Sequence, residues 1–152
     1  MGIKKIVLAY DGSDNSANAL KWTVDFALQT GADTDIVMVL EKPTVYPLEE
    51  IGQYIHMEAA YKEKLTMLIN TAAETFQAQK LKERSIIISG SDPAEEIINY
   101  AQQNHADLIV CGTRGFGGFK SLLIGSVAHR LVTYSNVPVL VIRSKKLVSA
   151  TT

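Results

Sequence analysis

Five short apolar segments alternate along the chain with longer segments in which apolar residues recur at helical spacing. The apolar segments are residues 6–9, 36–40, 86–88, 107–111 and 137–142. Continuous apolar runs of this length are typical of strands covered on both faces, as in a parallel sheet. We therefore predict an α/β fold, with one open five-stranded parallel sheet in the order 3-2-1-4-5 and helices on both faces.

The segments between the strands carry start and stop signals for helices. Ser13 or Asp14 can cap a first helix, which Gly31 ends, and Asp92 can cap a helix that begins at Pro93. A long helix is expected over residues 49–80. The first helix should bury Leu20, Val24, Ala27 and Leu28, and the long helix Tyr61, Leu65, Leu68, Ile69, Ala72, Ala73 and Phe76.

Size and charge limit the classes of function. The 152 residues suit one domain, which we place at 1–146 with a frayed tail at 147–152. A net charge of -1 gives no electrostatic basis for binding nucleic acid or an anionic membrane, and no apolar run reaches the length of a membrane span. Residues 1–5 lack the features of a signal peptide, so we expect a cytoplasmic protein.

The strongest functional signal is a glycine-rich loop after the fourth apolar run. Gly112 and Gly115 are followed, after nine residues, by Gly125 and Ser126 at the start of a helical pattern. Glycines allow backbone N–H groups to approach a ligand, and a helix start offers free N–H groups and a positive dipole end. This combination predicts a phosphate site. Neither a Walker A motif nor the dinucleotide fingerprint Gly-x-Gly-x-x-Gly after a first strand is present.

A second signal lies at the end of the first strand, where Asp11 follows the apolar run. In the predicted strand order the first and fourth strands are neighbours, so Asp11 and the loop at Gly112 should flank one crevice. Ligands of such sheets bind beyond the carboxyl ends of the strands, where the strand order reverses. Asp11 could also merely cap the first helix, Ser126 could cap the last one, and Arg114 and Lys120 could be solvated surface charges.

These residues resemble the universal stress protein family over nearly the whole chain. The resemblance rests on residues 9–13 with Ser16, on residues 106–112 and on residues 137–142. It also rests on the pattern Gly-x-x-Gly, nine residues, Gly, Ser or Thr, which that family associates with its ATP-binding members. The resemblance implies a Rossmann-like fold of the adenine nucleotide α-hydrolase type, with ATP and Mg²⁺ as ligands.

The resemblance also implies a role for each matched position. Asp11 would accept hydrogen bonds from ribose hydroxyls, and Ala128 stands where many binders carry a second hydroxyl residue. Ala9 and either Val39 or Leu40 would line an adenine pocket. The phosphates would be held by Gly112, Gly115, Gly125, Ser126 and Val127. Apart from the resemblance, Arg114 is a candidate phosphate contact because it places a positive charge in the same loop.

We interpret the chain as a regulatory nucleotide-binding protein, because it shows a phosphate cradle but neither a marked catalytic base nor a cluster of metal ligands. Slow ATP hydrolysis is compatible with this interpretation. The resemblance implies a homodimer through the last strand, Val137 to Ile142. The alternatives are an interaction module of the same fold that does not bind ATP, an ATP-using enzyme of the α-hydrolase type, and a flavodoxin-like electron carrier.

Overall fold

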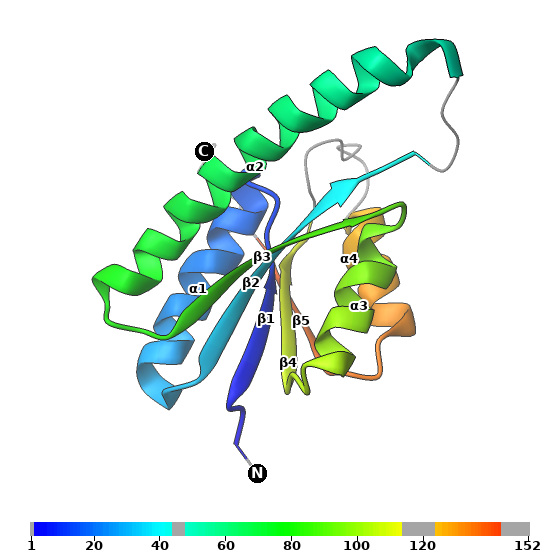
Figure 1. Ribbon diagram of the computed structural model, residues 1–152. Coiled ribbons are helices and arrows are strands. Elements are labelled where there is room, and N and C mark those ends of the chain that lie inside the picture. The colour runs from blue at the N-terminus through cyan, green and yellow to red at the C-terminus, as the bar shows by residue number, and fades with distance from the viewer. Residues whose placement is uncertain (1, 44–47, 114–123, 144–152) are drawn as a thin grey trace, which may run out of the picture.

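The structure, a computed structural model, describes residues 2–43, 48–113 and 124–143. Its centre is one parallel sheet in the order β3-β2-β1-β4-β5 (Figure 1). The strands are β1 (Lys5–Ala9), β2 (Asp33–Glu41), β3 (Glu83–Gly90), β4 (Leu108–Gly112) and β5 (Val139–Ile142). The predicted fold class and strand order are confirmed.

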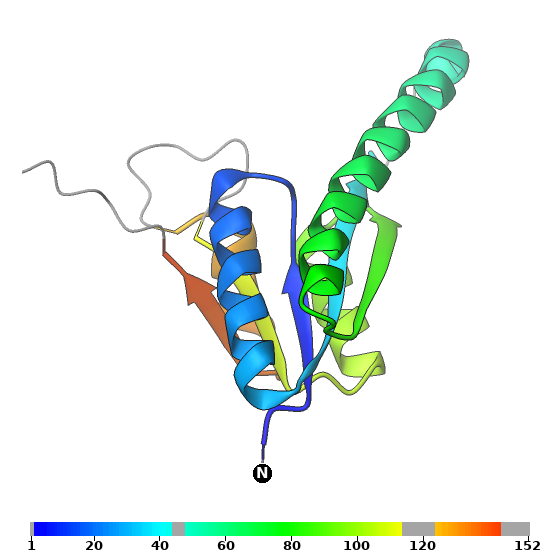
Figure 2. The same cartoon turned by 90° about the vertical axis from the view of Figure 1, so that its left-hand side faces the viewer.

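Helices cover both faces of the sheet, as predicted (Figures 1 and 2). They are α1 (Asp14–Thr30), α2 (Ile51–Ala78), α3 (Pro93–Gln103) and α4 (Ser126–Tyr134), with a short 3₁₀ helix, η1 (Leu48–Glu50), directly before α2. α1 and α2 pack on one face, and α3 and α4 pack on the other.

Each face of the sheet has its own apolar core. Ile6 and Leu8 of β1 point toward α1 and α2, whereas Val7 between them packs with α3 and α4. Successive side chains of a strand point to opposite faces, so a strand with helices on both sides needs an unbroken apolar run. This requirement explains the continuous runs from which the fold was predicted.

The predicted start and end of α1 and the predicted start of α3 are confirmed in their hydrogen bonds, whereas the long helix predicted over residues 49–80 runs from Ile51 to Ala78. The Ser13 hydroxyl accepts a hydrogen bond from the Ser16 N–H and caps α1, which ends at Gly31 with a φ of 73°. The Asp92 carboxylate accepts a hydrogen bond from the Glu95 N–H at the start of α3.

Three details of the prediction are wrong. The strand predicted from Val137 begins at Val139, after Pro138, which has no N–H to donate. Leu28 is 50% exposed, because it lies about 100° around the helix from the buried Ala27. Tyr61 is 45% exposed, because the first half of α2 runs beyond the end of the sheet (Figure 1). The proposed tail at 147–152 lies outside the described residues.

Across the described ranges, no helix combines the length and hydropathy that crossing a membrane requires.

A polar cluster fixes the sheet near the amino ends of its strands. The Asp35 side chain, 3% exposed, accepts hydrogen bonds from Arg84 (Nε to Oδ1, 2.9 Å; Nη2 to Oδ2, 2.8 Å) and from the Tyr100 hydroxyl (2.9 Å). Lys5 Nζ lies 3.3 Å from the same carboxylate. Burial by itself would raise the pKa of Asp35, but the hydrogen bonds and the Lys5 charge outweigh it and lower that pKa. Burial and Asp35 together raise the pKa of Tyr100 to about 12.

We expect Tyr100→Phe to lower the free energy of unfolding by about 1–2 kcal/mol, because it removes a hydrogen bond to a buried charge. Tyr134→Phe is the matched control, since that tyrosine is 64% exposed, and it should change stability by less than about 0.5 kcal/mol. Urea unfolding at pH 7 measures both values. Equal effects of the two substitutions would contradict the role assigned to the Tyr100 hydroxyl.

The pH dependence follows from the lowered pKa of Asp35. A carboxyl whose pKa is lower in the folded chain stabilises the fold above its unfolded pKa and loses that contribution as the pH falls through its folded pKa. Asp35→Asn should therefore cost about 2 kcal/mol at pH 7 and progressively less below about pH 4. Urea unfolding of both proteins between pH 7 and pH 3 measures this, and a difference that stays constant would contradict it.

Candidate functional site

The carboxyl ends of all five strands lie at one edge of the sheet, and β1 and β4 are neighbours there. Leu8 of β1 stands opposite Val110 of β4 in the parallel register. The chain leaves β1 for α1 on one face and leaves β4 toward α4 on the other. The edge between β1 and β4 is therefore the point where the strand order reverses, which is the usual place for a ligand in such a sheet.

Asp11 stands in the turn that follows β1. Its Oδ1 accepts a hydrogen bond of 2.9 Å from the Ser13 N–H, and Ser13 rather than Asp11 caps α1. Within the described residues the second carboxylate oxygen has no hydrogen-bond partner, so it can accept from a ligand. Gly12 has a φ of 82°, and a Cβ there would lie 2.9 Å from Leu68 Cδ1, so the turn requires glycine.

Gly112 ends β4 in close contact with the first turn of α1. A Cβ at Gly112 would lie 2.6 Å from the Asn15 carbonyl oxygen, closer than real Cβ atoms come. The neighbouring Thr113 hydroxyl lies 3.5 Å from Asn15 Oδ1. The glycine thus has a packing role that sequence analysis missed: it lets α1 approach β4 and brings the turn at Asp11 near the end of β4.

The start of α4 lies beside this same edge, because the Gly125 N–H donates a hydrogen bond to the Thr113 carbonyl. Gly125 is the N-cap of α4 and has no side chain to accept hydrogen bonds from the N–H groups of the first turn. Ser126 is the first helical residue, so its hydroxyl does not cap α4. The His129 N–H donates a hydrogen bond to the Gly125 carbonyl. No acceptor among the described residues pairs with the earlier N–H groups of this first turn, so they can donate to a ligand. The Ser126 side chain is exposed.

Apolar residues at the ends of β1 and β2 lie next to these polar groups. Ala9 and Val39 are half-buried on the face of α3 and α4, where Ile124 and Val127 pack against the same core. Leu40, the alternative to Val39, is 1% exposed in the core under α2. Of the two, Val39 shares the face of Ala9. The sequence did not predict that Ile124 packs beside Ala9 and Val39. The only feature that could have indicated it is an apolar residue directly before Gly125.

The remaining residues that were predicted to bind phosphate cannot be placed relative to these groups. Arg114 and Gly115, together with Lys120, lie outside the described residues. The described ranges contain no group of three or more histidine, cysteine, aspartate or glutamate side chains that could hold a metal ion.

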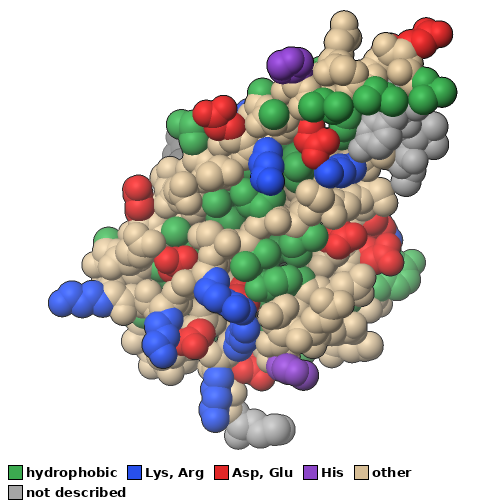
Figure 3. All heavy atoms as spheres, viewed as in Figure 1, with side chains coloured by type: hydrophobic (Ala, Val, Ile, Leu, Met, Phe, Trp, Pro, Cys, Tyr) green, Lys and Arg blue, Asp and Glu red, His purple; other side chains and the backbone are tan. Residues whose placement is uncertain are grey.

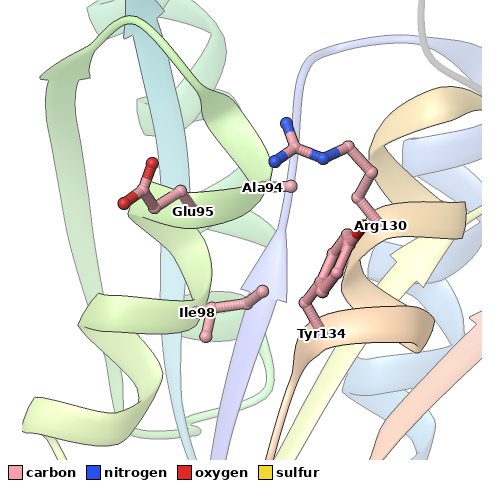
Figure 4. A pocket seen from close by; sticks show the side chains of 5 residues that line it. All are labelled: Ala94, Glu95, Ile98, Arg130 and Tyr134. Atoms are coloured by element: carbon pink, nitrogen blue, oxygen red, sulfur yellow. The ribbon is translucent and has the colours of Figure 1, made fainter.

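A separate hollow of about 340 Å³ lies between α3 and α4 (Figure 4). Arg130 forms an ion pair with Asp92, and its guanidinium carbon lies 5.8 Å from the centre of the Tyr134 ring. None of the residues predicted to bind a nucleotide lines this hollow. Its lining residues are Ala94, Glu95, Ile98, Arg130 and Tyr134.

Comparison with known proteins gives one consistent result. The sequence profile of the universal stress protein family matches residues 2–143. Universal stress protein YxiE of Bacillus subtilis is 35% identical over 148 residues, which cover 91% of this chain and 98% of that protein.

Solved structures share the fold. The structure of protein MJ0577 of Methanocaldococcus jannaschii is 29% identical, with a TM-score of 0.74, and the match covers 95% of this chain and 99% of that one. A universal stress protein family member from Arabidopsis thaliana, solved with AMP bound, is 19% identical, with a TM-score of 0.67. That match covers 94% of this chain and 93% of the plant protein.

The packing at Gly112 gives a testable prediction. Gly112→Ala should lower the free energy of unfolding by about 1–3 kcal/mol, because the added methyl group forces β4 and α1 apart. Gly52→Ala is the control: a Cβ there meets open space, so stability should stay unchanged or rise by up to about 1 kcal/mol. Urea unfolding compares the two. A Gly112→Ala protein as stable as wild type would show that the close approach is not required.

Proposed function

The chain belongs to the universal stress protein family, and on this basis we propose that it is a regulatory protein that binds ATP, together with Mg²⁺, at the carboxyl edge of β1 and β4. A cytoplasmic location is part of this proposal.

The observation that carries the proposal is the position of two complementary groups on either side of the strand reversal. The Asp11 oxygen that has no partner among the described residues can accept hydrogen bonds from ribose hydroxyls, since a carboxylate acts only as an acceptor. The first-turn N–H groups of Ser126 and Val127, with the Ser126 hydroxyl, can donate to phosphate oxygens at the positive end of α4. A nucleotide joins a ribose to phosphates and can bridge both groups.

The neighbouring residues suit the base of an adenine nucleotide. Ala9 and Val39 offer half-buried apolar surface beside Asp11 on which a purine ring can pack. The relative solved with AMP bound supports an adenine nucleotide in this fold. The glycine pattern of Gly112, Gly115, Gly125 and Ser126 supports ATP within that class, and we propose that Arg114 adds a positive charge to the phosphate site.

Mg²⁺ suits the site without a dedicated set of protein ligands. This ion keeps several waters and often binds through phosphate oxygens with few protein ligands. Its role would be to neutralise charge on the phosphates, while the chain supplies N–H donors. We assign no catalytic residue. ATP would act as a regulatory ligand. If it binds one conformation of the protein more tightly than another, it changes which surface is presented to a partner.

We also propose that two copies pair through β5. This strand is at one edge of the sheet, and its four residues, Val139 to Ile142, are apolar and half-buried. An apolar edge with unpaired backbone groups can be covered by the same strand of a second copy around a two-fold axis.

The nucleotide proposal predicts that freshly purified protein releases an adenine nucleotide on denaturation, or binds added Mg-ATP in the micromolar range. Asp11→Asn should weaken binding about tenfold or more, because it keeps Oδ1 for the Ser13 N–H but removes the charge that favours ribose hydroxyls. Gly115→Val should abolish binding. Chromatography with mass detection and calorimetric titration measure these results.

Asp25→Asn is the matched control for charge, since Asp25 is exposed in the middle of α1, and it should bind like wild type. Circular dichroism checks that each variant is folded. Wild-type protein that neither contains nor binds any adenine nucleotide in the presence of Mg²⁺ would contradict the proposal. It would favour an interaction module of the same fold.

The pairing of β5 predicts a homodimer. Sedimentation equilibrium or gel filtration with light scattering at micromolar concentration should give twice the mass of the chain. A charge in the edge strand, Val141→Lys, should shift the mass toward that of a monomer, because pairing would bring a lysine of each copy into an apolar interface. Only monomeric wild-type protein at these concentrations would contradict this pairing.

A further inference from the structure

The first half of α2 carries apolar side chains that the core does not cover. The helix extends past the carboxyl ends of the strands (Figures 1 and 2), and Figure 3 shows a row of hydrophobic side chains along this projecting part. Met57 is 70% exposed and Tyr61 45%, whereas Leu65 and Ile69, farther along the helix, are almost fully buried. Ile55 is also exposed, but it lies about 160° around the helix from Met57 and does not belong to this group. Exposed apolar side chains gathered on one element indicate an interaction surface.

One line of residues along this half of α2 has the spacing of a helix–helix seam. Met57 stands at its centre, with Tyr54 and Tyr61 three and four residues away on the same side of the helix. The full seam consists of Glu50, Gln53, Tyr54, Met57, Ala60, Tyr61 and Lys64. Counted outward from Met57, these positions are symmetric, at three, four and seven residues on each side.

The two ends of the seam carry opposite charges. Glu50 lies directly before α2, and Lys64 lies seven residues beyond Met57. Both are exposed, and neither forms an ion pair within the part of the chain that the structure describes. The nearby ion pair of Lys42 with Glu58 uses other residues. If the helix is laid antiparallel on an identical helix, Glu50 of each copy meets Lys64 of the other.

We propose that this seam is a docking surface for a second copy of the chain, with the two α2 helices antiparallel and the two-fold axis at Met57. The two Met57 side chains then face each other, Tyr61 meets Gln53 of the second copy, and Tyr54 meets its Ala60. The two ion pairs close the ends. A two-fold contact must be complementary to itself, and this seam satisfies that requirement in spacing and in charge.

The contact is separate from the other two proposals. It uses neither β5 nor the residues of the nucleotide site, so it stands or fails independently of both. The seam is about 21 Å long, which is short against a standard stable interface. We therefore expect association through α2 to depend on protein concentration, and to join β5-paired dimers into larger assemblies where both contacts form.

Cysteine cross-linking tests the position of the two-fold axis. Met57→Cys should give covalent dimers with a short bis-maleimide reagent, because the two side chains face each other. Met67→Cys is the matched control, 68% exposed on the same helix but about 80° around it from Met57, and should give several-fold less. Wild type sets the background, since Cys111 is buried and burial raises the pKa of its thiol to about 12.

Charge reversal tests the register in the Met57→Cys background. Glu50→Lys and Lys64→Glu should each weaken association about tenfold, because each change places like charges together at both ends of the seam. The double variant should restore cross-linking toward the parent level. Circular dichroism checks that each variant retains its fold.

Equal cross-linking at positions 57 and 67, or none at either, would overturn the proposal. Cross-linking at position 57 that is unaffected by the charge reversals would overturn the antiparallel register. Met57→Glu should remove the gain in mass above the β5-paired dimer that wild type shows at rising protein concentration in sedimentation equilibrium. A mass that is unchanged by this substitution at all concentrations would show that the α2 surface does not bind a second copy.

Discussion

β1 pairs in parallel with β2 on one side and with β4 on the other, and the rest of the structure depends on this central position. Both faces of β1 must be covered, which places α1 and α2 on one side and α3 and α4 on the other. The chain therefore passes from β1 to α1 on one face of the sheet and from β4 to α4 on the other. The candidate site lies between the carboxyl ends of β1 and β4, where Asp11 and the start of α4 are found.

The two edges of the sheet have different roles. At the amino edge, the buried carboxylate of Asp35 is fully engaged by Arg84, Tyr100 and Lys5, and it joins α3 to three strands. At the carboxyl edge, the described residues engage the polar groups only in part: Asp11 uses one oxygen, and Gly125 provides no side-chain cap for α4. A saturated cluster stabilises the fold, whereas unsaturated donors and acceptors can bind a ligand.

Much of the fold could be predicted from the sequence, because continuous apolar runs and helix caps such as Ser13 and Asp92 have local causes. The positions of Asp11 after β1 and of Gly125 before α4 could be predicted for the same reason, since each adjoins a recognisable element. The packing of Gly112 against Asn15 could not be found, because it joins residues far apart in the chain. The exposure of Tyr61 also escaped prediction, since helical spacing does not show where the sheet beneath a helix ends.

The central claim is that the groups around Asp11 and the start of α4 bind one nucleotide together. Backbone amide NMR during titration with Mg-ATP tests it most directly. Bound nucleotide should shift the amides that follow Asp11 and those of Ser126 and Val127 along one saturation curve. Shifts confined to the hollow at Arg130 and Tyr134, or no shifts at millimolar ATP, would contradict the claim.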